Sequence, residues 1–238
     1  MVSAGSPLIH LRNVTKDYRA LRPLRVRELA IGESQAIALL GFDGAMAEVL
    51  VSLITGAALP DSGEVLVEGN PTSDVTDSDT WMKLLERFGL LTERTVLVEQ
   101  LTTEQNLAIP YTLDLESASD AVRQRIRALA VEVGLSPAEL SAPVAVISAL
   151  AKMRVRLGRA LALEPRIVLA EHPNATLSAD DTPVFAADFS RIISRRRVAA
   201  LVFTADRAFA ASVSDQVLTL QPATGELRRA SGWRRWFS

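Results

Sequence analysis

The sequence contains no cysteine and only two histidines, and each scarcity excludes a kind of site. Without cysteine the chain forms no disulfide, no thiolate metal site and no cysteine nucleophile. The histidines, His10 and His172, leave little for zinc. No apolar run approaches the roughly 18 residues that a membrane-spanning helix needs. Residues 1–8 show no basic-then-apolar signal segment, so we expect a cytoplasmic protein.

An excess of one charge is also missing, with one local exception. The 26 basic and 28 acidic residues leave a net charge of −2, which gives no uniform field for binding nucleic acid. Residues 227–238 differ, because four arginines and no acid accompany Trp233 and Trp236 there. Such a tail suits a lipid headgroup layer or an acidic partner, and the alternative is a tail folded back on its own domain.

The amino-acid composition is typical of a folded globular protein. The chain has 238 residues, of which 48% are apolar and 23% charged, and this balance excludes a disordered or collagen-like protein. Length and composition fit one domain with a sizeable core.

Strand-like and helix-like segments alternate along the chain. Aliphatic runs predict strands, and apolar positions three or four apart predict helices. We expect strands at 8–14, 35–40, 64–68, 166–170, 198–204 and 216–220. We expect helices at 47–55, 80–88, 117–133, 148–163 and 183–195. The alternation predicts an α/β fold with parallel βαβ units, and residues 93–157 read as an inserted helical subdomain.

A strand, a glycine-containing turn and a helix follow one another as they do around a phosphate-binding loop. The segment runs from the expected strand through Gly41 and Gly44 into the next helix. A working loop needs Gly-Lys-[Ser/Thr] after its second glycine. The glycine lets backbone N–H groups approach the phosphates, the lysine neutralises them, and the hydroxyl holds Mg²⁺. Met46, Ala47 and Glu48 stand at those positions.

Several segments in order make the whole chain resemble the nucleotide-binding subunit of an ABC transporter, closest to the lipoprotein-export, macrolide-export and cell-division type. They are Asn-Val-Thr-Lys-Asp-Tyr18, Pro60-Asp-Ser-Gly63 to Gly69, Leu101-Thr to Pro110, Gly158-Arg159 to Pro173, and Ser214-Asp215-Gln-Val-Leu-Thr-Leu. The resemblance implies a P-loop-type domain with a parallel-sheet core and an N-terminal antiparallel β part. It implies a core of 1–92 and 158–226, a helical subdomain of 93–157 and a tail of 227–238.

The resemblance also identifies positions where the family's ATP-handling residues are replaced. These degenerate positions are Met46, Ala47, Glu48, Glu93, Ser148, Glu171, His172 and Ala205. Ala47 stands for the phosphate lysine and Glu48 for the Mg²⁺ hydroxyl. Glu171-His172 stands for the pair that supplies the Mg²⁺ ligand and the general base. If nucleotide binds at all, the resemblance gives Tyr18, Gly41 and Gly44 as its contacts.

These replacements predict that hydrolysis is lost at this chain's own site. Phosphoryl transfer depends on positioned charges, and losing one preorganised donor can cost on the order of 3 kcal/mol. We therefore expect no enzyme activity, no catalytic residue, no cofactor and no metal.

Simpler roles compete at four of the singled-out residues. Glu48 either satisfies the free N–H groups of its helix or binds a metal with Glu171. His172 is either structural or a replacement base. Tyr18 either packs or stacks on a base, and Ser148 is either a helix cap or a phosphate ligand.

The leading hypothesis is a pseudo-ATPase subunit, peripheral on the inner face of the cell membrane. It docks on an integral-membrane permease and pairs with a second, different nucleotide-binding subunit. By resemblance, the permease contacts are Arg94, Thr95, Val96 and Leu97. The alternatives are an ATP-hydrolysing subunit that uses Glu48, Glu171 or His172 in a rearranged site, and a free-standing regulator.

Overall fold

Two sheets of different kinds form the frame of the molecule. The computed structural model describes residues 6–112, 114–115 and 118–230. An antiparallel sheet has the order β2-β1-β4-β5 and comprises β1 (Ile9–Lys16), β2 (Leu24–Ile31), β4 (Ser62–Val67) and β5 (Asn70–Pro71). The larger sheet has the order β10-β9-β3-β8-β7-β6. It comprises β3 (Ala36–Leu40), β6 (Phe88–Leu91), β7 (Ile167–Glu171), β8 (Ala199–Phe203), β9 (Gln216–Gln221) and β10 (Glu226–Arg229), parallel except for β10.

Apart from α7 (Asp181–Arg196), the helices of the described residues begin at short polar N-cap side chains that accept hydrogen bonds from free N–H groups. They are α1 (Gly44–Ile54), α2 (Ser78–Leu85), α3 (Thr103–Ala108), α4 (Asp120–Glu132), α5 (Pro137–Ser141), α6 (Ala149–Leu161), α7 (Asp181–Arg196) and α8 (Arg207–Val213), with 3₁₀ turns at Thr72–Asp74 and Val144–Val146. Thr102 and Ser136 form capping boxes with Gln105 and Glu139. Such reciprocal caps fix where a helix starts.

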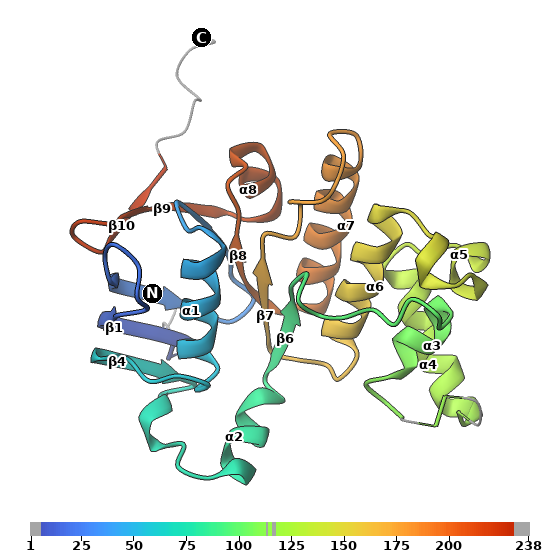
Figure 1. The fold of residues 1–238 in the computed structure, drawn as a ribbon, viewed down its shortest axis with the longest axis horizontal. Coiled ribbons are helices and arrows are strands. Elements are labelled where there is room, and N and C mark those ends of the chain that lie inside the picture. The colour runs from blue at the N-terminus through green and yellow to red at the C-terminus, as the bar shows by residue number, and fades with distance from the viewer. Residues whose placement is uncertain (1–5, 113, 116–117, 231–238) are drawn as a thin grey trace, which may run out of the picture.

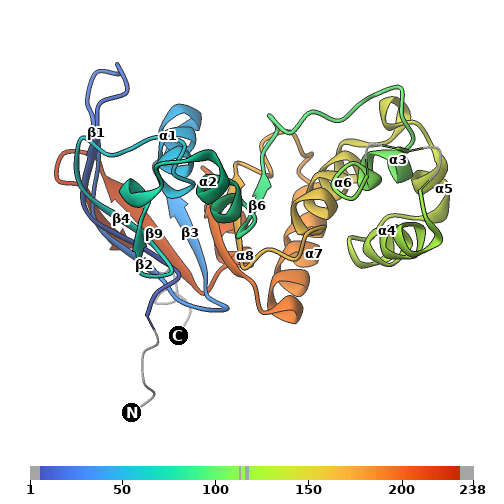
Figure 2. The same cartoon turned by 90° about the horizontal axis from the view of Figure 1, so that it is seen from below.

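The parallel strands are apolar on both faces because both faces are covered. On one face, Ile37 and Leu39 of β3 pack with α1 and the antiparallel sheet. On the other face, Ala38 and Leu40 belong to a cluster with α6, α7 and α8. Figures 1 and 2 show α1 beside the antiparallel strands at one end of the molecule, and α3, α4 and α5 at the opposite end.

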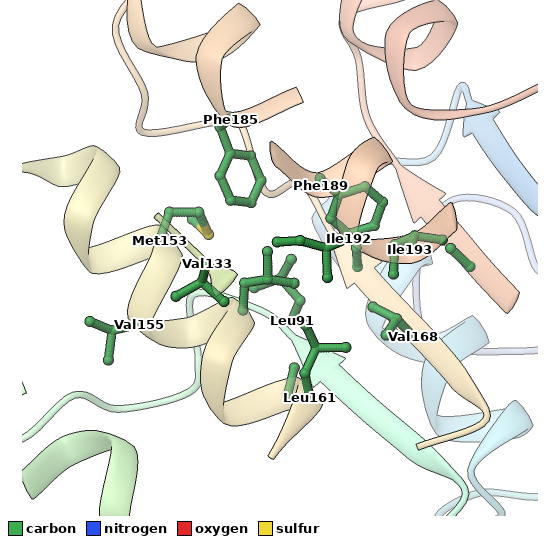
Figure 3. Packing of buried hydrophobic residues seen from close by; sticks show 14 of the residues in the cluster. Leu91, Val133, Met153, Val155, Leu161, Val168, Phe185, Phe189, Ile192 and Ile193 are labelled. Atoms are coloured by element: carbon green, nitrogen blue, oxygen red, sulfur yellow. The ribbon is translucent and has the colours of Figure 1, made fainter. Parts of the chain in front are cut away.

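The second cluster joins the helical subdomain to the sheet. Phe185 of α7 lies beside Met153 of α6, Phe189 lies farther along the same helix, and Leu91 and Val168 of the sheet lie below them (Figure 3). Phe189 is fully buried. This continuous apolar contact fixes the position of the helical subdomain relative to the carboxyl ends of the strands.

The structure confirms the α/β fold with an antiparallel part and an inserted helical subdomain, and it corrects several boundaries. Strand β2 was not predicted individually, because its apolar alternation is interrupted at Glu28. The helix expected at 80–88 ends at Leu85, so Phe88 begins strand β6. Helix α6 continues past the expected subdomain border at residue 157 to Leu161.

The expected tail also starts too early. Residues 227–229 belong to β10, in which Leu227 pairs with Leu220 of β9. Trp233 and Trp236 lie outside the described residues. Over the ranges that the structure describes, no helix has the length and apolar character to cross a membrane.

Candidate functional site

A cavity lies where the loops after β3, β6 and β7 meet at the carboxyl edge of the parallel sheet. Its volume is about 240 Å³, and it is lined by Gly44, Glu48, Thr92, Glu93, Arg94, Glu171, His172 and Ala175. Parallel α/β sheets place their ligand sites at this edge, because successive strands end there together. The structure thus brings together Glu48, Glu93 and the neighbouring pair Glu171 and His172, three positions that lie far apart in the sequence.

The glycine turn forms as expected, but an unexpected residue caps the helix after it. Gly41 has a φ of 85°, a conformation that side chains disfavour. Asp43 is the N-cap of α1, and its Oδ1 accepts a hydrogen bond from Met46 N at 2.8 Å. The role of satisfying the helix N–H groups therefore belongs to Asp43, and its assignment to Glu48 was wrong. An aspartate directly before the first helical residue was the signal for this cap.

Glu48 instead takes part in an ion bridge across the cavity. Arg94 Nη1 pairs with Glu48 Oε1. Arg94 Nη2 donates to Glu171 Oε1 at 2.6 Å and to Oε2 at 2.7 Å. The Glu171 side chain is 9% exposed, whereas those of Arg94 and Glu48 are 47% and 54% exposed. The guanidinium therefore joins one buried and one solvated carboxylate, from β7 and α1.

Burial dominates the ionisation of Glu171. Burial raises the pKa of Glu171 above its ordinary value, although the charge and hydrogen bonds of Arg94 act in the opposite direction. The nearby Glu48 carboxylate raises it further. Arg94 thus offsets only part of the cost of placing a carboxylate at the end of a buried strand.

The donor set does not fit a Mg²⁺ ion. Of the three carboxylates that line the cavity, Glu48 and Glu171 already pair with Arg94, and Glu93 accepts a hydrogen bond from Thr176. Glu48 also stands at the position where the resemblance places a hydroxyl. Within the described residues, no group of three or more histidines and carboxylates is arranged to hold a metal. The hypothesis that Glu48 and Glu171 bind a metal together is not supported, because a cation of the protein lies between them.

Glu93 and His172 line the same cavity but take no part in the ion bridge. Thr176 Oγ1 donates to Glu93 Oε1 at 2.5 Å, which ties the start of the loop after β6 to the segment after β7. His172 adopts a positive φ of 45°, and its N–H donates to Phe203 O at 2.9 Å. Its Nε2 is buried without a hydrogen-bond partner in the part of the chain described. The backbone hydrogen bond to Phe203 fixes the turn after β7, so the structure favours the structural role for His172.

The remaining predicted positions have structural roles. Ser148 caps α6 by accepting from Ala151 N at 3.1 Å, as the simpler prediction stated. Ala47 is fully buried in the cluster around α1, and Met46 packs against that cluster. Ala205 is exposed beside Asp206, which caps α8. Tyr18 packs against the same cluster, and burial followed by the charge of Asp43 raises its pKa.

The four residues expected to contact a permease separate into different environments. Arg94 faces the cavity, whereas Val96 is 73% exposed and Thr95 is half-buried. Leu97 is 8% exposed and belongs to the core cluster. Its assignment to the contact surface was wrong, because an apolar side chain in this short loop gains more from burial in the core. Nothing local in the sequence indicated that Arg94 would reach both carboxylates.

The sequence relatives are named as import ATP-binding proteins. A methionine import ATP-binding protein of Brucella abortus (strain 2308) is 23% identical over 218 residues, covering 92% of this chain and 58% of that protein. A methionine import ATP-binding protein of Pseudomonas syringae pv. tomato is 28% identical, covering 90% and 64%. A sulfate/thiosulfate import ATP-binding protein of Thermosynechococcus vestitus is 28% identical, covering 89% and 61%. The chain thus spans about three fifths of the length of these relatives.

Solved structures share the fold. The cbiO1 protein from Clostridium perfringens, part of the ABC transporter complex cbiONQ, superposes with a TM-score of 0.79 at 18% identity, covering 94% of this chain and 87% of that one. A dimeric bacterial ABC transporter cassette gives a TM-score of 0.76 at 22% identity, covering 94% of this chain and all of the other. At these identities the likeness establishes the fold alone.

The relatives overturn one expectation drawn from the sequence. The replaced motif positions led us to expect that the chain is not an enzyme. That expectation is wrong by this comparison, because the relatives are named as ATP-binding import proteins. The export and cell-division sub-type stays a prediction.

A family profile gives the assignment. The profile described as ABC transporter matches residues 24–175, more than half of the chain, from β2 to the segment after β7. This range includes the glycine turn, the ion bridge and the whole helical subdomain. The chain belongs to the ABC transporter family.

Proposed function

We propose that the chain is the cassette subunit of an ABC transporter complex, peripheral on the cytoplasmic face of a membrane. In this proposal it docks on an integral-membrane permease and pairs with a second cassette subunit, a different chain. The observation that carries the proposal is an exposed, largely apolar groove beside the loop after β6.

The groove lies between β6, α3 and the end of α6. Its volume is about 290 Å³, and it is lined by Phe88, Gly89, Leu90, Thr95, Ile109, Pro110, Arg159, Ala160, Leu163 and Pro165. Leu90 is 37% exposed and Leu163 is 60% exposed, and Val96 of the adjoining loop is 73% exposed. Exposed apolar side chains gathered around a groove favour a protein partner, and a short helix laid into the groove fits this shape. A cytoplasmic helix of a permease is the occupant that we propose.

The second cassette is supported by the free end of α6. Val146 is 74% exposed, and Ser148 and Ala149 are also exposed at the start of that helix. A solved cassette with this fold is dimeric. An open helix N-terminus next to an exposed valine offers the second subunit both backbone donors and apolar surface.

A second candidate function is ATP binding in the cavity at the edge of the sheet. Arg94 is the cation among the residues that line this cavity, so it is the group that would meet phosphate oxygens. Relatives named as ATP-binding proteins support this candidate.

Melting temperature tests the ATP candidate. We expect ATP to raise it in the wild-type chain and to have no effect on Arg94→Gln, since a ligand at a hundred times its Kd adds about 2.7 kcal/mol of stability. The titration is run with and without Mg²⁺. An absent shift at millimolar ATP in the wild-type chain would contradict the candidate.

Copurification from detergent-solubilised source membranes tests the docking proposal. We expect the wild-type chain to retain an integral-membrane protein and a second cassette, and we expect Leu163→Glu and Val96→Glu to lose the membrane protein at least tenfold. Val131→Glu is the matched control, because Val131 is 76% exposed on α4 and lies outside the groove. Equal retention by all three variants would contradict docking at this groove.

A further inference from the structure

The loop that joins β6 to α3, residues 92–102, is tied to the α/β core through side chains. Arg94 bonds to Glu171 at the end of β7 and pairs with Glu48 of α1. One residue earlier, Glu93 accepts from Thr176 Oγ1 at 2.5 Å. The first half of the loop is therefore fastened to two segments that follow parallel strands.

The same loop is tied to the helical subdomain from the other side. Arg159 Nη1 of α6 donates to Val96 O at 2.7 Å, and Arg156 Nε donates to Thr95 O at 3.4 Å. Asn106 of α3 is fully buried and brackets Val98, accepting from Val98 N at 2.9 Å and donating to Val98 O at 3.0 Å. Thr95 and Arg159 also line the apolar groove, so these bonds set one wall of it.

Arg94 differs from these other ties because its one guanidinium lies between two carboxylates and pairs with both. Without its guanidinium, Glu48 and the buried Glu171 would face one another across the cavity as like charges. Like charges at such a site repel, and a buried carboxylate without a partner is unfavourable. The loop, α1 and β7 therefore depend on the same cation.

We propose that Arg94 is a positioning residue, a latch that fixes residues 92–98 in their docking conformation when no nucleotide is bound. The guanidinium supplies the charge that joins the loop to α1 and β7, so the wall of the groove is formed before any ligand enters the cavity. The proposal rests on the docking function proposed above, since it describes how the docking groove is kept in shape.

Hydrogen exchange of the full chain, followed by mass spectrometry, tests the latch. In the wild-type chain we expect peptides covering 92–98 to be protected without nucleotide. In Arg94→Gln we expect exchange of these peptides to rise about tenfold, while peptides of β3 and β8 stay unchanged. Glu48→Gln, which removes the solvated carboxylate, should give a smaller rise in the same peptides.

The matched control is Arg12→Gln, which removes a half-exposed arginine paired with Glu64 at 3.5 Å in the antiparallel sheet. It should leave peptides 92–98 unchanged. Unchanged exchange in both Arg94→Gln and Glu48→Gln would overturn the latch, as would protection that arises in the wild-type chain only after ATP is added. Glu48→Gln changes an exposed side chain, so it remains informative if Arg94→Gln fails to fold. Copurification of the wild-type chain distinguishes failure of the latch proposal from failure of the docking proposal. If only the latch proposal is wrong, the wild-type chain still retains the permease.

Discussion

The two faces of the parallel sheet are held by apolar packing, whereas its carboxyl edge is held by pairs of opposite charges. On the faces, Leu39 and Ala38 lie in apolar clusters that need only shape and hydrophobicity. At the edge, Glu48 and Arg94 form contacts that depend on charge. The residues that build the cassette fold are therefore separable from the residues that give its site a chemistry, and a family fold does not specify what the edge does.

The largest expected effect comes from breaking a face. Phe189→Ala on α7 should lower the free energy of unfolding by about 3–5 kcal/mol, because the deleted ring leaves a cavity in a fully buried cluster. Urea denaturation monitored by circular dichroism measures this loss. Val184→Ala on the same helix is the control, since Val184 is 44% exposed and its truncation should change stability by less than about 0.5 kcal/mol. If both variants lost the same free energy of unfolding, burial on the face of the sheet would not be the source of the stability.

A smaller effect should come from a polar contact between helices. Arg196 of α7 bonds to both carboxylate oxygens of Glu132 at the end of α4, and these hydrogen bonds hold the pKa of Glu132 below its ordinary value. Arg196→Gln should cost about 1 kcal/mol near neutral pH, because the pair is partly screened by solvent. Urea denaturation at several pH values measures the cost.

The sign of the pH dependence follows from the lowered pKa. The stabilisation is fully present above the unfolded pKa of a glutamate, about 4.3, and disappears as the pH falls through the folded value. The wild-type chain and Arg196→Gln should therefore converge in acid. Arg195→Gln is the comparison variant, since Arg195 is exposed on the same helix and lowers the pKa of Glu132 through its charge alone, so its loss should have a smaller effect. A difference that persists unchanged in acid would show that Glu132 is not the partner that matters.

Local patterns were sufficient to predict most of the fold. The run Ile167 to Ala170 gave a buried strand, and Ser148 gave the start of α6, since strands and caps depend on neighbours in sequence. The environment of Leu97 was not predictable in this way. Its burial depends on the helical subdomain packing over the loop, which no pattern within the loop records.

The site was predicted by position but not by contact. The sequence identified Glu48 and Glu171 as the residues at the phosphate end of the sheet, and both lie there. It assigned Arg94 to a partner surface. Arg94 and Glu171 are far apart in the sequence, and only the parallel pairing of β6 with β7 brings them close enough to form an ion pair. Long-range charge pairs of this kind are the part of a site that a single sequence leaves open.

The central place of β3 also has a consequence for synthesis. Ala36 of β3 pairs with Ala200 of β8, and Ala38 pairs with Val217 of β9. At ribosomal rates of about 5–20 residues per second, β3 waits roughly ten to thirty seconds before either neighbour has emerged. During that time the run Ala-Ile-Ala-Leu-Leu has no partner strand on either side, so the parallel sheet closes only after most of the chain has been synthesised.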